Sequence, residues 1–225
     1  MNNGVNYKLP NQRKRNLTMP TFQYSVQIYK MSVQKPFRKM DKSGLIIQRP
    51  AGAYLIRPIG PDDSLFIRDI ILETLIEHGA VGGGFASGDR DTQEMYSAFQ
   101  RPGRKYFVVL KYDGLAGHPV GDPLGGAGFA SLPGEEGTCE LVKMYFRPEI
   151  RGVGIGKVLL ELCLKEARKA GYHMMYLETI EQMTAARGLY EHLGFRQIPH
   201  ALGKTGHYSC DVFYVRELED VTHDP

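Results

Sequence analysis

The sequence has few cysteines and no long apolar run. Only three of the 225 residues are cysteine, and Cys139, Cys163 and Cys210 are widely spaced within apolar segments. A scattered, odd set of this kind indicates buried thiols in a reducing compartment and excludes a disulfide framework. No apolar stretch reaches the roughly 18 residues that a membrane span requires, and no apolar segment follows a charged N-terminus as in a signal peptide. We therefore expect a cytoplasmic protein that is neither secreted nor held in a membrane.

Metal-binding patterns are missing as well. The seven histidines show no H-x-x-x-H spacing and no pairing with cysteine, so we expect no metal site. Apolar residues make up 42% of the chain and charged residues 24%, which fits neither a disordered nor a membrane protein. A chain of 225 residues can bury the core of one domain and still carry an appendage.

The charge is unevenly distributed. The net charge is +3, but residues 1–50 contain ten Lys or Arg against the single acid Asp41, a surplus of nine positive charges, so the remainder has a surplus of six negative charges. This split places the basic character in an appendage, and no nucleic-acid partner is expected for the body of the protein. We predict a basic, largely unstructured extension over residues 1–50, with a candidate strand at Phe22–Tyr29, and one domain over residues 53–218.

The role of the extension stays open between three interpretations. The first is a flexible basic arm. The second is an organellar transit segment, which is typically rich in Arg and poor in acids. The third is a start codon placed too early, in which case the true start is one of Met19, Met31 and Met40.

Strands and helices alternate along the predicted domain. Apolar periodicity and Gly or Pro breaks predict strands over residues 53–60, 105–112, 125–132, 138–146, 173–180, 195–198 and 207–215. Helices are predicted over residues 61–79, 92–99, 154–170 and 181–193. Helices that return the chain between strands are typical of an α/β layer, here preceded by antiparallel strands.

The segment RGVGIGK at residues 151–157 carries the clearest chemical signal. A strand ends at Pro148, and glycines at 152, 154 and 156 then open an amphipathic helix. These glycines remove side chains where backbone N–H groups converge at a helix N-terminus, so an anion can approach closely. The spacing matches neither the dinucleotide pattern G-x-G-x-x-G near a first strand nor the nucleotide P-loop G-K-S/T. We interpret the segment as a phosphate-binding loop of another kind.

This loop resembles the acetyl-CoA motif of the GCN5-related N-acetyltransferases (GNAT), which reads Arg/Gln-x-x-Gly-x-Gly/Ala. The matching residues are Arg151, Gly152, Val153, Gly154, Ile155 and Gly156. A later segment, AARGLYEHLGFRQI at residues 185–198, resembles the family block A-x-x-L-Y-x-x-x-G-F. The resemblance covers roughly residues 53–218 and implies the acyl-CoA N-acyltransferase fold, a mixed, mostly antiparallel sheet flanked by helices.

The resemblance also implies roles for single residues. Backbone amides of residues 151–157, helped by the charge of Arg151 or Lys157, would hold the CoA pyrophosphate. Tyr190 matches the tyrosine that protonates the leaving thiolate, and Met183 stands where many members have an asparagine, so one side-chain contact to the cofactor is missing. The strand that pairs with the pantetheine arm and polarises the thioester carbonyl is matched by Met144, Tyr145 and Phe146.

Acetyl transfer requires a base, because an alkyl amine with a pKa of about 10.4 is mostly charged at pH 7. Glu140 is the first candidate, since many family members place a carboxylate at this strand position, and Glu178 and His207 are the reserves. By the same analogy, the acceptor pocket is expected to contain Phe85, Asp89, Asp91, Tyr96 and, in the segment GKTGHYSCD, His207.

Several of these residues also have a purely structural interpretation. Tyr190 lies on the apolar stripe of its helix, and Glu140 could occupy the solvated face of its strand. Cys139 could act as a nucleophile, but a core thiol is favoured because no histidine partner can be assigned. The GGG run at residues 82–84 follows a helix instead of opening one, which favours a mobile loop.

The function expected from the resemblance is transfer of an acetyl group from acetyl-CoA to the primary amine of a small molecule, such as an amino acid or a polyamine, by direct attack in a ternary complex without a metal. Homodimerisation is left open. A protein or peptide acceptor is one alternative. The other is a non-catalytic acyl-CoA sensor whose basic extension contacts an anionic partner.

Overall fold

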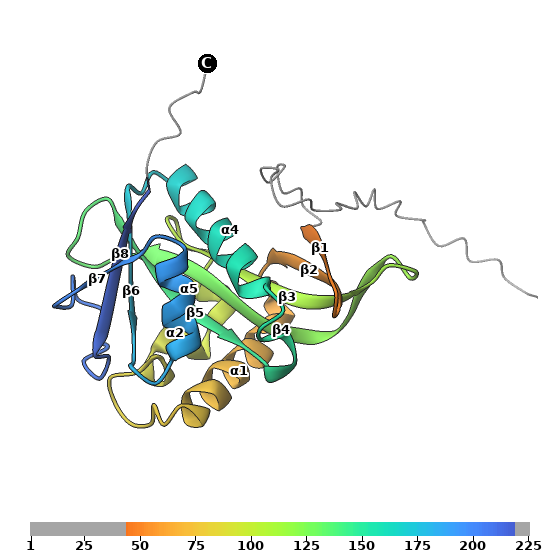
Figure 1. The fold of residues 1–225 in the computed structure, drawn as a ribbon, viewed down its shortest axis with the longest axis horizontal. Coiled ribbons are helices and arrows are strands. Elements are labelled where there is room, and N and C mark those ends of the chain that lie inside the picture. Colours follow the sequence, from red (N-terminus) through yellow and green to blue (C-terminus); the bar gives the residue numbers. More distant parts are fainter. Residues whose placement is uncertain (1–43, 219–225) are drawn as a thin grey trace, which may run out of the picture.

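Strands of the described chain form one sheet in the order β1-β2-β3-β4-β5-β6-β8-β7 (Figure 1). The computed structural model describes residues 44–218. Neighbouring strands are antiparallel except β5 and β6, which are parallel, so the predicted mixed, mostly antiparallel sheet is confirmed. The strands are β1 Leu45–Arg49, β2 Gly52–Pro58, β3 Lys105–Asp113, β4 His118–Ser131, β5 Thr138–Phe146, β6 Met174–Thr179, β7 Arg196–Ile198 and β8 Val212–Glu217.

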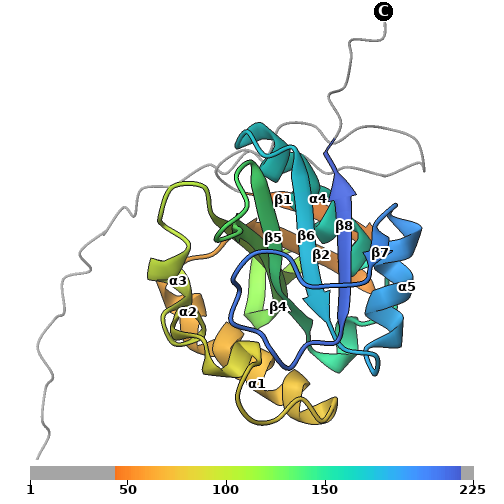
Figure 2. The ribbon, with the colours of Figure 1, turned by 90° about the vertical axis from the view of Figure 1, so that its left-hand side faces the viewer.

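Helices cover both faces of this sheet (Figure 2). Those on one face come before β3 in the chain, whereas α4 and α5 lie on the other face. The α-helices are α1 Ser64–Glu77, α2 Arg90–Gln93, α3 Met95–Ala98, α4 Ile155–Lys169 and α5 Thr184–His192. Short 3-10 turns are η1 Pro61–Asp63, η2 Ala86–Gly88 and η3 Pro148–Ile150.

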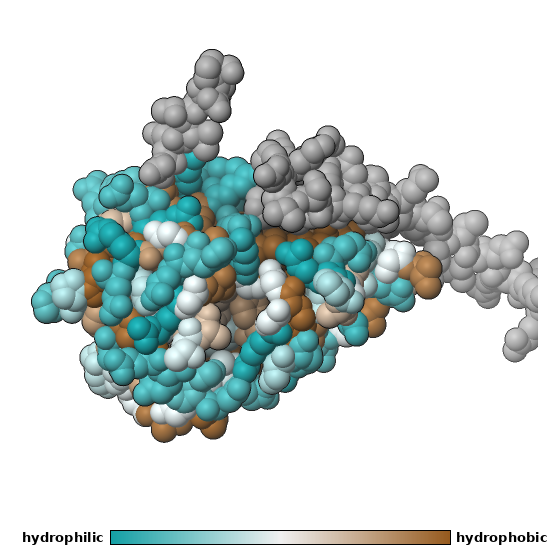
Figure 3. Space-filling view, in the orientation of Figure 1, coloured by the Kyte–Doolittle hydropathy of each residue, from teal (hydrophilic) through white to brown (hydrophobic). Residues whose placement is uncertain are grey.

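Each helical layer buries its own apolar core against the sheet. On α4, Leu159, Cys163 and Ala167 repeat every four residues and are fully buried against strands of the sheet. On α1, Ile67 and Ile71 do the same against the opposite face. The outer surface over α4 and α5 is mainly hydrophilic, with apolar residues only in small patches (Figure 3). The sheet is therefore fixed from both sides, and its strand ends can hold side chains in defined positions.

The folded region begins earlier than residue 53. Residues Leu45–Arg49, which we expected within the unstructured extension, form the edge strand β1 and pair antiparallel with β2 from Leu45↔Ile56 to Arg49↔Gly52. The β-branched residues Ile46 and Ile47 favour a strand, and the two-residue turn at Pro50 and Ala51 allows this hairpin. The remainder of the predicted extension, with the candidate strand Phe22–Tyr29, lies outside the described residues.

The last strand begins later than expected. It starts at Val212 and not at His207, because the intervening segment packs on the glycine-rich loop after α1. Ser209 Oγ donates a hydrogen bond to the carbonyl oxygen of Gly83 at 2.8 Å. A Cβ atom at Gly84, where φ is +79°, would lie 2.7 Å from the ring of Tyr208. Close approach of Tyr208 therefore explains Gly83 and Gly84, whereas Gly82, with a φ of +107° and nothing within 4 Å, is explained by its backbone conformation.

Strands β5 and β6 pair over only three residues. Thr138, Cys139 and Glu140 pair with Met174, Met175 and Tyr176, and no later pair joins these two strands among the described residues. β6 continues to pair with β8 as far as Thr179↔Val212. Consequently the two parallel strands separate in the middle of the sheet, which exposes main-chain groups of β5 and leaves room for a cavity.

Candidate active site

A cavity lies where β5 and β6 stop pairing. Its walls are formed by residues 140–145 of β5 and by residues 177–180 at the end of β6. Phe85, from the loop after α1, and His207 line it from one face of the sheet, and Tyr190 of α5 lines it from the other. The cavity thus connects the two faces of the sheet through the gap between the strands.

A bulge in β5 directs Lys143 towards this cavity. The pairing of β4 with β5 shifts between Gly126 and Gly128, and Lys143 has a φ of +54°, the only positive φ of a non-glycine residue within residues 44–218. This conformation costs an L-residue about 1 kcal/mol or more. Lys143 Nζ lies 2.5 Å from Asp89 Oδ2, and the side chain is only 5% exposed. The bulge therefore places a buried ammonium beside the predicted acceptor residues.

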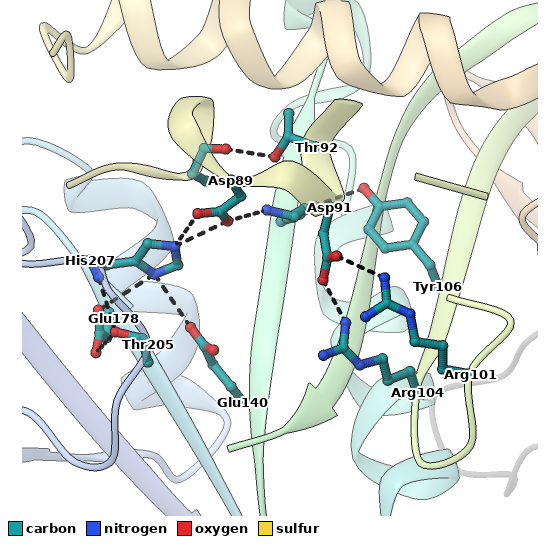
Figure 4. Close-up of polar contacts among 12 residues, drawn as sticks. Asp89, Asp91, Thr92, Arg101, Arg104, Tyr106, Glu140, Glu178, Thr205 and His207 are labelled. Carbon is teal, nitrogen blue, oxygen red and sulfur yellow. Dashed lines mark hydrogen bonds and ion pairs between the residues drawn. The ribbon is translucent and has the colours of Figure 1, made fainter. Parts of the chain in front are cut away.

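His207 lies between three carboxylates that come from three separate elements (Figure 4). Its Nε2 is 3.1 Å from Asp89 Oδ2, and its Nδ1 is 3.6 Å from both Glu140 Oε1 and Glu178 Oε2. Burial disfavours the charged imidazole, but the neighbouring carboxylates outweigh burial and raise the pKa of His207 to about 12. His207 is therefore protonated at neutral pH.

The carboxylates around His207 differ in their environments. Burial raises the pKa of Glu140, against the opposing effect of His207. For Asp89, hydrogen bonds from His207 and Lys143 overcome the effect of burial and lower the pKa. Glu178 Oε1 accepts hydrogen bonds from Tyr176 Oη at 2.7 Å and Thr205 Oγ1 at 2.9 Å. Glu178 Oε2 accepts none from the described residues, although its side chain is only 3% exposed.

Two of the predicted acceptor residues lie away from the cavity. Asp91 is paired with Arg104 at 2.5 Å and with Arg101 at 3.3 Å, so its carboxylate points away from His207 (Figure 4). Tyr96 packs against the core beneath α1. Asp91 and Tyr96 therefore do not line this cavity, whereas Phe85 lines it and Asp89 holds His207 at its edge.

Lys143 is the functional candidate that sequence reasoning missed. The direct signal in the sequence was a lysine within the otherwise apolar strand segment LVKMYF. A bulge is not visible in such a pattern, because lysine in a half-exposed strand is ordinary. Within β4, Gly126 and Gly128 were a second, indirect signal of this bulge, because glycines inside a strand often mark an irregularity in the pairing.

The glycine loop has the geometry expected of an anion site. Gly152 has a φ of +74°, and Gly154, with a φ of +82°, is the N-cap of α4. Amides of the first turn of a helix have no carbonyl partner within it, so the N–H groups that follow Gly154 can bind an anion. Any other residue at Gly154 would be strained at this φ, and its Cβ would lie 3.4 Å from Arg49 Nε. The loop therefore fits a phosphate group.

The two basic side chains of the loop are placed differently. Arg151 binds Glu77 of α1 through both terminal nitrogens, at 2.6 and 2.7 Å, and its Nε donates to the carbonyl oxygen of Phe146 at 2.8 Å. Lys157 Nζ is exposed and lies 3.1 Å from His192 Nε2. Arg151 therefore fastens the loop to α1 and β5, while Lys157 can meet a ligand.

Tyr190 is buried and lines the cavity from α5. Its ring packs against Phe195 and Tyr214, each with a centroid distance of 6.0 Å. Burial raises the pKa of Tyr190, so the phenol keeps its proton at neutral pH. Met183, the residue at the position of the family asparagine, also lines the cavity.

Two of the three cysteines are buried as expected, and the third is not. Cys139 and Cys163 lie in the core under α4, and burial raises the pKa of Cys139 to about 12. This disfavours the thiolate that a nucleophile would need. Cys210 is half-buried and lines the cavity, because it lies in the segment before β8 and not in the strand.

Within residues 44–218, no group of three or more His, Cys, Asp or Glu side chains is arranged to hold a metal ion. No helix in the same range is long and apolar enough to cross a membrane.

A family model described as the acetyltransferase (GNAT) family matches residues 67–195. The chain belongs to the GNAT family. It is 39% identical over 166 residues to Escherichia coli YjgM, named as an uncharacterized N-acetyltransferase, and this alignment covers 73% of the chain and 95% of YjgM. It is 31% identical over 119 residues to the E. coli L-amino acid N-acyltransferase MnaT, covering 48% of this chain and 69% of MnaT.

Solved structures show the same GNAT fold. An acetyltransferase of the family from Staphylococcus aureus has a TM-score of 0.61 at 19% identity, covering 74% of this chain and 99% of its own. YncA from Salmonella typhimurium, solved with its cofactor acetyl-CoA, has a TM-score of 0.56 at 25% identity, covering 74% of this chain and 95% of its own. The resemblance found in the sequence is thus confirmed, and this GNAT protein is an acyltransferase of the N-acetyltransferase type.

Proposed function

We propose that this GNAT protein transfers the acetyl group of acetyl-CoA to the primary amine of a small molecule, by direct attack in a ternary complex. The observation that carries the proposal is the cavity between β5 and β6, which has the buried carboxylate of Glu140 on one face of the sheet and the phenol of Tyr190 on the other. A small acceptor is supported by MnaT, which is named for acylating L-amino acids.

Acetyl-CoA would bind along the separated strand and the glycine loop. The N–H groups of residues 152–157 would hold the pyrophosphate, with Lys157 adding charge at the surface. Met144, Tyr145 and Phe146 lie beyond the last pair of β5 with β6, so the edge of this segment is open to the pantetheine arm. Arg151, whose charge is paired with Glu77, would contribute by holding the loop in place.

Each bond change in the proposed reaction has a matching group. Glu140 removes a proton from the ammonium, and the neutral nitrogen attacks the thioester carbon. The new C–N bond forms as the C–S bond breaks, and Tyr190 Oη supplies the proton for the sulfur, so CoA leaves as the free thiol. The nitrogen loses its second proton as the amide forms, and this proton restores the Tyr190 phenol through solvent. In this proposal His207, whose pKa the neighbouring carboxylates raise, is protonated and orients Glu140 and Glu178 instead of acting as the base. General base catalysis of this kind contributes about a hundredfold or more.

The test is a thiol-release assay with acetyl-CoA on the full-length chain. The acceptors are amino acids, aminoacyl amides, polyamines, aminoglycosides and peptide amines. Turnover with one class of small amine supports the proposal. Calorimetric binding of acetyl-CoA without turnover of any small amine contradicts it and favours a protein acceptor.

A further inference from the structure

The two buried cations of the acceptor cavity are already paired with a carboxylate of the protein. Asp89 Oδ2 lies 2.5 Å from Lys143 Nζ and 3.1 Å from His207 Nε2 (Figure 4). The Lys143 side chain is 5% exposed and that of His207 14%. One carboxylate from the loop between η2 and α2 therefore occupies the place between them where an anionic group of a ligand would bind.

Glu140 and Glu178 share one cation, His207, which is itself closer to Asp89. His207 Nδ1 is 3.6 Å from each, which is longer than a hydrogen bond. Glu178 Oε2 accepts no hydrogen bond from the described residues although the side chain is almost fully buried. With Lys143 and His207 charged, the three carboxylates leave a surplus of one negative charge. A buried carboxylate oxygen without a hydrogen bond, in a cluster with surplus negative charge, is costly, so this part of the cavity suits an ammonium group.

The same arrangement is unfavourable for an α-amino acid. Its carboxylate is attached to the carbon that carries the amine, so it must enter the cavity together with the reacting nitrogen. There it meets the like charges of Glu140 and Glu178, in an environment where such repulsion is strong. The cations that could bind it, Lys143 and His207, are held by Asp89.

We propose that Asp89 is a specificity-determining residue that makes this enzyme select primary amines lacking an α-carboxylate. This inference rests on the proposed function and narrows its substrate class to alkyl amines and aminoacyl amides. It separates this chain from MnaT, whose name gives L-amino acids as its acceptors.

The experiment compares leucine, leucinamide and 3-methylbutylamine, which share a side chain and differ at the carboxyl position. For each, kcat/KM is measured with acetyl-CoA, and Kd is measured by calorimetry with CoA present. For the wild type we expect kcat/KM at least tenfold higher for both carboxylate-free amines than for leucine. For Asp89→Asn we expect this preference to fall at least tenfold, because the amide leaves Lys143 and His207 able to bind the leucine carboxylate.

Matched controls separate this effect from folding and from amine basicity. Asp91→Asn changes the same residue type two positions later, where it is paired with arginines outside the cavity, so the preference should stay as in the wild type. Asp89→Glu keeps the charge and should keep the preference. Intrinsic differences between the amines cancel when the ratio of kcat/KM for a carboxylate-free amine to kcat/KM for leucine is compared between wild type and variant.

A wild-type preference for leucine would overturn the proposal, as would an unchanged ratio in a folded Asp89→Asn variant. If that variant does not fold, Asp89→Ser takes its place in the same comparison. If no amine is turned over, the proposed function has failed, but the calorimetric comparison still applies. Tighter binding of leucinamide than of leucine then supports the assignment of Asp89, and equal, reversed or absent binding overturns it.

Discussion

The glycine loop and the acceptor cavity of this protein are built in different ways. The loop is a continuous stretch of residues 151–157, in which positive φ angles and the start of α4 orient backbone amides. The cavity gathers single charged side chains from distant segments, namely Asp89, Glu140, Lys143, Glu178 and His207. Backbone geometry should therefore control cofactor binding, whereas a balance of charges should control the acceptor and the proton.

Replacing Gly154 should have the largest effect, and it tests whether backbone geometry in the glycine loop controls cofactor binding. In Gly154→Val, a β-branched residue must adopt a φ of +82° with its Cβ 3.4 Å from Arg49 Nε, so the loop that orients the amides must change its conformation. We expect acetyl-CoA binding to weaken at least about a hundredfold, measured by calorimetry. Gly188→Val is the matched control, because Gly188 is exposed on α5 with nothing within 4 Å of its Cβ position. Retained affinity in a folded Gly154→Val protein would place the phosphates elsewhere.

Glu140→Gln tests the acceptor cavity, where charged side chains should control proton transfer. We expect kcat to fall about a hundredfold with unchanged acetyl-CoA affinity, since the amide cannot accept the proton. The base must be ionised, and burial raises the pKa of Glu140, so wild-type activity should be lost as the pH falls through that raised pKa. This limb of the pH profile should disappear in the variant.

The control for Glu140 is another buried carboxylate, Glu166. It is paired with Lys105 at 2.7 Å and with Lys169 at 2.5 Å and does not line the cavity. Glu166→Gln should cost some stability and leave kcat unchanged. Equal losses of kcat in the two variants would mean that Glu140 acts only through stability.

Tyr190→Phe should have an intermediate effect. Loss of the phenolic proton should lower kcat about tenfold with little change in the KM for acetyl-CoA, because the ring packing against Phe195 and Tyr214 is kept. Tyr214→Phe is the control, since Tyr214 Oη donates to Glu191 at 2.7 Å and lies outside the cavity wall. Unchanged turnover in Tyr190→Phe would remove Tyr190 from the proposed mechanism.

The same difference explains how far the sequence could be interpreted. Residues 151–157 were recognised because a backbone-built site is contiguous, so its glycines appear at fixed spacing. Most strands and helices were also predicted, because apolar periodicity is local. Strand β1 was missed because a five-residue edge strand next to a basic segment carries little signal.

The acceptor end could be predicted only in part. Glu140, Glu178 and His207 were each named as candidate bases. That both glutamates lie beside the His207 imidazole depends on the position of the segment before β8, which the sequence does not show. Asp89 and Asp91 could not be told apart, because neighbouring loop residues of the same type point in directions that the sequence does not show. Here one pairs with His207, and the other pairs with Arg104.

Lys157→Gln should have the smallest effect and sharpens the comparison most. If backbone amides dominate the loop, removing the exposed charge of Lys157 should weaken acetyl-CoA binding only about three- to fivefold. Because this contribution is electrostatic and exposed, the difference from the wild type should vanish near 1 M salt, where the screening length is about 3 Å. Calorimetric titrations at low and high salt measure both values. A loss above about thirtyfold that persists in high salt would show that a side chain, and not the backbone, holds the phosphates, and the contrast between the loop and the cavity would then be lost.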